Sequence, residues 1–147
     1  MDADEFVAAS EAALSEAGSK ARPLLERAES LWTGEPLPED RYADWSLAWR
    51  EELSDRYLQV LAALAGVCSL EGDHEQAVVA GRKSLEIDPL NEGAHRALMT
   101  AYARAGRTSR ALRQYLACRR ALVEELGVEP AQATSRLQAR ILAGESV

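Results

Sequence analysis

The chain has 147 residues, of which 47% are hydrophobic and 28% charged, and a net charge of −7, as expected of one globular domain. Helix-forming Ala, Leu, Glu and Arg dominate, and only five prolines and nine glycines interrupt them. No apolar run reaches the ~18 residues of a membrane span and no signal segment starts the chain, so we expect a soluble, cytoplasmic protein without membrane contact.

Apolar periodicity predicts an all-α protein of about seven antiparallel helices, at 3–17, 20–32, 43–71, 73–87, 91–105, 107–126 and 130–143. On the long third helix, large apolar residues recur every four positions: Trp45, Trp49, Leu53, Tyr57 and Leu61. We interpret this stripe as a surface that faces the core of a helical stack, with a ligand groove as the alternative.

The stretch LWTGEPLPEDRYADW links the second and third helices and is rich in rings for an aromatic-poor chain. Trp32 ends the second helix and Trp45 begins the third, with Pro36 and Pro38 between them. Prolines lower the entropy of the unfolded segment, and buried indoles would fix the crossing between two helix pairs. We favour this clamp over the alternative, a docking patch for a partner.

An internal repeat of 34 residues follows, in which Leu64, Gly72 and Ala77 recur as Leu98, Gly106 and Ala111. This is the length of a helix-turn-helix unit of the tetratricopeptide type. Gly72 and Gly106 fall where the chain reverses, a place where a positive φ is easy only for glycine. Ala77 and Ala111 fall early in the second helix of each unit, where a small side chain lets two helices approach closely.

Neighbouring positions agree with this register. Pro89 stops the helix before it, and Asn91 is a good N-cap for the helix that follows. In the preceding unit, Cys68 and Gly81 stand where large aromatic residues are usual, so that unit is degenerate. In the second unit, five positions fill the repeat pattern: Leu98, Tyr102, Gly106, Ala111 and Tyr115.

Charge is distributed unevenly along the chain. Residues 1–92 hold 8 Lys and Arg against 20 Asp and Glu, whereas residues 93–123 hold seven arginines and no acid. We call these arginines the basic band: Arg96, Arg104, Arg107, Arg110, Arg113, Arg119 and Arg120. We expect Arg110, Arg113 and Arg120 to face solvent or a partner, and the basic band to pair with an acidic surface of this chain, a second copy or another protein.

The repeat register also predicts a concave face lined by first helices. It would carry Gln59, Ala62, Gly66, Ser69, Arg96, Thr100, Ala103 and Arg104. Guanidinium groups pair with carboxylates in a two-pronged geometry, so such a face suits an acidic peptide. This face and the basic band together give the candidate partner-binding residues: Arg96, Thr100, Arg104, Arg107, Arg110, Arg113 and Arg120.

Residues with catalytic or metal-binding potential are few. Cys68 and Cys118 lie in apolar helical patterns, which favours reduced core residues over a disulfide or a reactive thiol. His74 and His95 have no metal-ligand spacing. With no nucleophile elbow, phosphate loop or paired carboxylates, we expect no cofactor, no metal and no enzymatic activity.

Several stretches, in order, resemble one family: AESLWTGEPL, YADW, REELSDRYLQVLAALA, GDHEQAV, DPLNEGAHRALM, ELGVEP and RLQARIL. They are similar to the bacterial transcriptional activator domain of SARP-type regulators. The resemblance covers 2–143 as a single domain, with 144–147 as a tail. It implies a tetratricopeptide-like, right-handed all-α stack.

In this family the domain usually follows a winged helix that binds DNA, and the resemblance here begins at Asp2, directly after Met1. We therefore expect an excised regulatory domain rather than a naturally standalone one. The resemblance implies a regulatory and oligomerisation module, forming a homodimer or contacting the transcription machinery, with DNA bound only through the missing winged helix. The alternatives are a general scaffold that binds an acidic peptide and, less favoured because residues 1–92 are so acidic, direct nucleic-acid binding by the basic band.

Overall fold

The computed structural model describes residues 1–34 and 47–147, and within them it contains seven α-helices and no strand. A 3₁₀ turn (Gly18–Lys20) precedes the second helix. The helices are α1 (Ala3–Ser15), α2 (Ala21–Leu31), α3 (Leu47–Leu70), α4 (His74–Ile87), α5 (Glu92–Arg104), α6 (Thr108–Leu126) and α7 (Gln132–Leu142). The predicted all-α stack is confirmed. The start of the expected third helix, including Trp45, lies outside the described residues.

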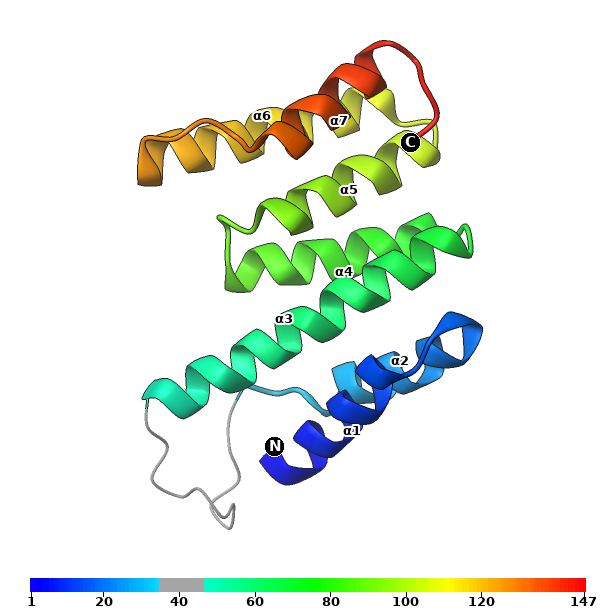
Figure 1. Cartoon of the computed structure of the whole chain (residues 1–147), viewed down its shortest axis with the longest axis vertical. Helices are drawn as coiled ribbons and strands as arrows, with labels where there is room; N and C mark the ends of the chain where they lie inside the picture. Colours follow the sequence, from blue (N-terminus) through cyan, green and yellow to red (C-terminus); the bar gives the residue numbers. More distant parts are fainter. Residues whose placement is uncertain (35–46) are drawn as a thin grey trace.

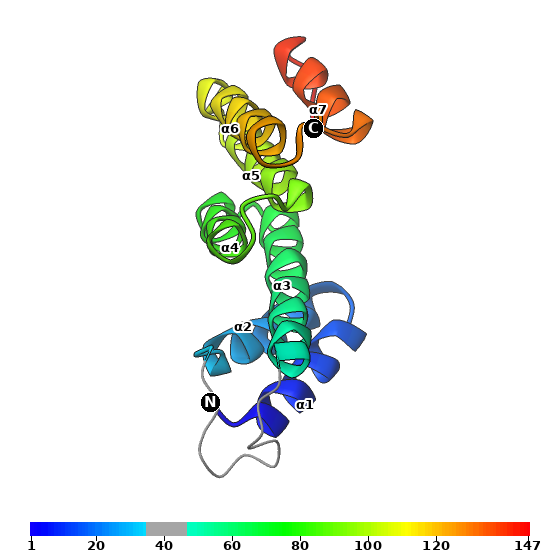
Figure 2. The ribbon, with the colours of Figure 1, turned by 90° about the vertical axis from the view of Figure 1, so that its left-hand side faces the viewer.

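The helices stack along one axis as successive antiparallel hairpins, with the two chain ends at opposite ends of the stack (Figure 1). Seen from the side, α2, α4 and α6 form one layer, and α1, α3, α5 and α7 form the other (Figure 2). Within the second layer, α3 contacts α5 and α5 contacts α7. Three helices that are far apart in the sequence therefore share one continuous face.

Two reversals of the chain repeat the same geometry 34 residues apart. Gly72 ends α3 with φ of +79° and Gly106 ends α5 with φ of +78°, values that a side chain would strain. The Asp73 N–H donates to the Cys68 carbonyl at 2.8 Å, and the Arg107 N–H donates to the Tyr102 carbonyl at 2.8 Å. These hydrogen bonds satisfy helix-end carbonyls in the Schellman pattern, so both hairpins turn in the same way.

Small residues set the distance between the paired helices. Ala77 and Ala111 are buried, each at the start of the second helix of its hairpin. Gly81 on α4 meets α5 closely, because a β-carbon built there would lie 2.8 Å from Leu98 Cγ. The absence of an aromatic side chain at position 81 therefore has a steric reason. Leu98 already fills that space.

The link between α4 and α5 follows from Pro89 and Asn91. α4 ends at Ile87, two residues before Pro89, and the Asn91 side chain accepts a hydrogen bond from the Ala94 N–H at 3.1 Å. Buried His95 joins this turn to α6, because its ring nitrogens contact the Pro89 carbonyl at 2.9 Å and the Gln114 amide at 2.8 Å. Each ring nitrogen thus has a hydrogen-bond partner within the protein.

The aromatic stripe of α3 faces the core over its described length. Leu53, Tyr57 and Leu61 are buried, and Trp49 packs against the same cluster. The Trp32 ring stacks on Tyr57 with centroids 4.5 Å apart, so it joins the end of α2 to α3. The proposed partner of Trp32 in the clamp, Trp45, is outside the described residues, and the clamp stays a prediction.

Ion pairs tie the first hairpin to the second. Arg22 of α2 donates to the Asp73 carboxylate at 2.6 Å, and Lys83 of α4 lies 2.7 Å from Glu29 of α2. Arg22 holds the pKa of Asp73 below its ordinary value, with help from the Gln76 N–H. Asp73 is also the N-cap of α4, so one carboxylate links the local end of a helix to the packing of two hairpins.

Both cysteines are buried and free, as predicted. Burial raises the pKa of the Cys118 thiol to about 11 and also raises the pKa of Cys68. Within the described ranges, the structure has neither a group of side chains suited to a metal ion nor a helix with the length and apolar character of a membrane span.

Candidate functional site

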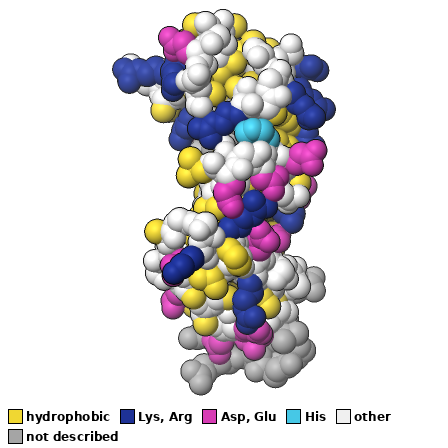
Figure 3. Space-filling model, turned by 90° about the vertical axis from the view of Figure 1, so that its right-hand side faces the viewer, with side chains coloured by type: hydrophobic (Ala, Val, Ile, Leu, Met, Phe, Trp, Pro, Cys, Tyr) yellow, Lys and Arg dark blue, Asp and Glu magenta, His cyan; other side chains and the backbone are white. Residues whose placement is uncertain are grey.

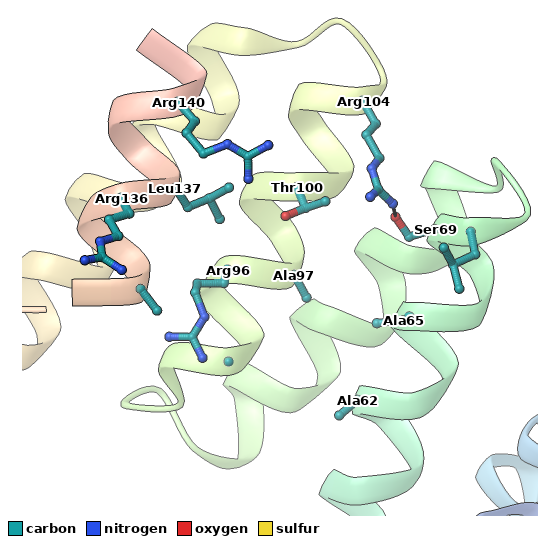
Figure 4. Close-up of a pocket in the computed structure, with 14 residues that line it drawn as sticks. Ala62, Ala65, Ser69, Arg96, Ala97, Thr100, Arg104, Arg136, Leu137 and Arg140 are labelled. Carbon is teal, nitrogen blue, oxygen red and sulfur yellow. Dashed lines mark hydrogen bonds between the residues drawn. The ribbon is translucent and has the colours of Figure 1, made fainter. Parts of the chain in front are cut away.

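A groove of about 730 Å³ crosses α3, α5 and α7 on their shared face (Figure 4). Its floor consists of Ala and Gly residues, which recur about one turn apart on α3 and α5 and are joined by one alanine of α7. These floor residues are Ala62, Ala65, Gly66, Gly93, Ala97 and Ala133. The helix backbones are therefore close to the groove surface. The volume is in the range of sites that hold a small ligand or a short segment of chain.

Four arginines surround this floor, two from α5 and two from α7, and we call them the arginine rim: Arg96, Arg104, Arg136 and Arg140 (Figure 4). No acidic residue is among the described residues that line the groove. The rim therefore presents positive charge from two helices, and its nearest members on different helices, Arg104 and Arg136, are 32 positions apart in the sequence.

Hydrogen bonds fix the two α5 members of the arginine rim. Arg96 Nη1 donates to Thr134 Oγ1 at 2.9 Å, and that hydroxyl in turn donates to Glu92 at 2.8 Å. Arg104 donates to Ser69 Oγ at 2.5 Å. Both guanidinium groups thus bridge neighbouring helices of the shared face, and their positions depend on how α3, α5 and α7 pack.

The two α7 members differ from each other. Arg140 donates to the Ser146 carbonyl and lies 3.6 Å from Glu145, so it holds the chain that follows α7. Arg136 is exposed, and within residues 1–34 and 47–147 it makes no hydrogen bond or ion pair. Arg136 is therefore the rim member with its full hydrogen-bonding capacity available to a partner.

The predicted partner-binding residues separate onto three surfaces. Arg96, Thr100 and Arg104 line the groove. Arg107 and Arg110 border a smaller hollow of about 200 Å³ between α4 and α5. The remaining candidates, Arg113 and Arg120, are exposed on α6. The basic band is thus continuous in sequence but not on the surface. A helix completes one turn in about 3.6 residues, so arginines that are close in the sequence point to different sides of their helix.

Two residues expected on the concave face, Gln59 and Ala103, are outside the groove lining. Gln59 lines a neighbouring hollow together with Glu51, Glu52 and Asp55, and Ala103 borders a hollow near the C-terminal residues. The contribution of α7 was also missed. The sequence did contain a signal for it. The predicted helix 130–143 occupies the position of a first helix, as 43–71 and 91–105 do, and it carries Arg136 and Arg140 four positions apart.

Basic and acidic side chains gather on different parts of the surface. On the face of Figure 3, Lys and Arg side chains are numerous in the upper part, over the C-terminal helices, and Asp and Glu lie mostly in the middle and lower parts. The acidic hollow with Glu51, Glu52 and Asp55 continues the groove face along α3, since positions 55, 59, 62 and 66 lie on one side of a helix. The shared face is therefore basic at one end and acidic at the other.

The outer side of α6 carries a second candidate surface. Leu116, Val123 and Leu126 are 57%, 40% and 58% exposed, and their spacing of seven and three places them in one row. We call them the α6 row. Arg119, between them, forms two hydrogen bonds of 2.8 Å with Glu129, which lowers the pKa of that carboxyl. An apolar row beside exposed arginines is typical of a protein contact surface.

Comparison with known proteins gives the family. The model of the bacterial transcriptional activator domain matches residues 1–142. The regulatory protein AfsR of Streptomyces coelicolor is 37% identical over 122 residues, which are 83% of this chain and 12% of AfsR. AfsR of Streptomyces griseus is 36% identical over 125 residues, or 84% of this chain and 12% of that protein.

The transcriptional regulator RedD of Streptomyces coelicolor is 34% identical over 132 residues, which are 88% of this chain and 37% of RedD. The chain thus spans about an eighth to just over a third of the length of these relatives, all of which are named as regulators and not as enzymes. Since the family model extends over nearly every residue, the chain belongs to the bacterial transcriptional activator domain family.

Proposed function

We propose that this chain is the regulatory and oligomerisation module of a bacterial transcriptional activator and acts in the cytoplasm. In this proposal it works through protein contacts, with itself or with the transcription machinery, and a separate winged-helix domain binds DNA. The relatives support a role in transcription, because two are named regulatory proteins and one a transcriptional regulator.

One observation carries the self-association part of the proposal. The α6 row exposes three large apolar side chains on a single helix, and isolated exposed leucines are common whereas aligned ones are less so. Arg113 and Arg120 flank the row, and Glu124 and Glu125 lie at the end of the same helix. An antiparallel pairing of two α6 helices would place arginines of one copy near glutamates of the other.

Light scattering coupled to size separation, at low and high protein concentration, tests this surface. We expect a concentration-dependent dimer that Leu116→Glu weakens by at least about tenfold, because a carboxylate would replace one of the three apolar side chains of the α6 row. Leu142→Glu is the matched control, since Leu142 is equally exposed but lies on α7. A monomer at every concentration, or a dimer that tolerates Leu116→Glu, contradicts the proposal.

The groove favours a second candidate function, a scaffold that captures an acidic segment without any role in transcription. The two candidate functions make different demands on the α6 row: the oligomerisation module needs it for the dimer, whereas the scaffold does not need it. Duplex DNA titrated with this chain at physiological ionic strength should remain unbound under either candidate, because residues 1–92 are strongly acidic. Tight, salt-sensitive binding of DNA would instead assign the basic band to nucleic acid.

A further inference from the structure

We infer that the groove across α3, α5 and α7 binds an acidic peptide segment of a partner protein, whose carboxylates pair with the arginine rim. The inference deepens the protein-interaction role proposed above and rests on it. It assigns a site and a chemical class of partner to the face formed by α3, α5 and α7, which is separate from the α6 row.

The arginine rim supplies the charge complementarity. Arg96, Arg104, Arg136 and Arg140 come from two helices, and the described groove lining holds no carboxylate. Glu145, outside the lining, lies 3.6 Å from Arg140, and no ion pair with the other three is seen among the described residues. A guanidinium binds a carboxylate through two parallel hydrogen bonds, which are stronger than hydrogen bonds between neutral groups. A segment with several Asp or Glu side chains could therefore contact rim members on both sides of the floor.

The floor admits the backbone of such a segment. Ala62, Gly66, Ala97 and Ala133 project almost nothing into the groove, and a β-carbon built at Gly66 meets no atom within 4 Å. Thr100 lies between the α5 arginines and offers a hydroxyl to a peptide group. The groove thus has a charged rim, an apolar floor and a central polar group, which are features of peptide-binding grooves.

Two observations favour a peptide over a nucleic acid. No aromatic residue lies in the described lining, so unpaired bases would have no ring on which to stack. Glu51, Glu52 and Asp55 continue the same face along α3, and they would repel the phosphates of any strand longer than the groove. A peptide can end, or change charge, where the acidic hollow begins.

Fluorescence anisotropy measures the binding directly. The probe is a fluorescein-labelled peptide in which Glu alternates with Ala, amidated at its C-terminus, and the matched control is the same peptide with Gln in place of Glu. We expect the Glu peptide to bind and the Gln peptide to bind at least about tenfold more weakly, since each pairing with a guanidinium is charge-assisted. Duplex DNA serves as the competitor.

Variants locate the site. Arg136→Gln should weaken binding of the Glu peptide by about tenfold, whereas Arg113→Gln, at an exposed arginine on α6, should leave it unchanged. Gly66→Glu should weaken binding further, because it places a carboxylate in open space on the floor, and Gly66→Gln controls for bulk. Far-UV circular dichroism confirms that each variant retains its helices.

The outcomes separate cleanly. Weaker binding by Arg136→Gln and Gly66→Glu but not by Arg113→Gln establishes the groove. Equal binding of the Glu and Gln peptides, equal loss with Arg113→Gln, or displacement of the peptide by duplex DNA at physiological ionic strength overturns the inference. Dimerisation measured on the same samples keeps the proposals distinct, because a dimer that binds no peptide refutes the groove and leaves the α6 row intact.

Discussion

Replacing Gly81 by alanine tests how closely α4 and α5 approach. The new β-carbon would lie 2.8 Å from Leu98 Cγ and 2.9 Å from its Cδ2, too near for any unshifted contact. Leu98 is 1% exposed and packs in a cluster with Met99 and Tyr102, so it cannot move outward freely. Overpacking of this kind costs about 1–3 kcal/mol.

Helix propensity opposes this cost, since alanine is about 1 kcal/mol better than glycine within a helix. The expected net effect of Gly81→Ala is therefore a destabilisation of roughly 1 kcal/mol, and a melting temperature lower by about 2–4 °C. Gly66→Ala isolates the propensity term, because Gly66 lies within α3 and nothing is within 4 Å of its β-carbon position. We expect Gly66→Ala to stabilise the chain by about 1 kcal/mol.

Urea denaturation followed by circular dichroism measures both variants against the wild type. The comparison depends on the difference of roughly 2 kcal/mol between the two alanine variants rather than on either value alone. If Gly81→Ala stabilises the protein as much as Gly66→Ala does, Leu98 does not lie over Gly81, and the packing of α4 against α5 described above is wrong.

Three further predictions concern burial and charge. Cys68 and Cys118 should not react with Ellman's reagent at pH 8 until the chain unfolds, because both are buried with raised thiol pKa values; rapid native-state labelling would contradict this. Asp73 has a lowered pKa, so its contribution to stability is complete above its ordinary value and is lost as pH falls through the folded value. Thermal melts should show that Asp73→Asn is less stable than the wild type near neutral pH and that the two converge in acid; a constant difference would refute the linkage. Trp32→Ala should lower the free energy of unfolding by roughly 3 kcal/mol, since it removes the ring stacked on Tyr57, whereas Trp32→Phe should cost less in the same urea titration.

The 34-residue repeat shows why part of the fold could be predicted. Gly72, Gly106, Pro89 and Asn91 act on backbone within a few positions of themselves, through a positive φ, a missing N–H and a side-chain cap. Such signals are local, so they indicate where helices begin and end without any knowledge of the tertiary structure. Apolar periodicity likewise identified Leu53, Tyr57 and Leu61 as core.

The candidate site was only half visible in this way. The repeat register placed Ala62, Gly66, Ser69, Arg96, Thr100 and Arg104 on one face, and all six line the groove. It also placed Gln59 and Ala103 there, which the packing assigns to neighbouring hollows. Periodicity gives the side of a helix to within a broad sector, whereas the rotation of each helix against its neighbours decides which residues of that sector share a groove.

The sequence by itself determined the helical repeat, its reversals, its caps and the acidic and basic segments of the chain. Only the tertiary structure decided that α7 completes the groove with Arg136 and Arg140, and that the basic band divides among three surfaces. The physical reason is the range of the interactions. A turn or a cap is formed by residues close in the chain, but the groove exists because α3, α5 and α7 pack side by side across large distances in sequence.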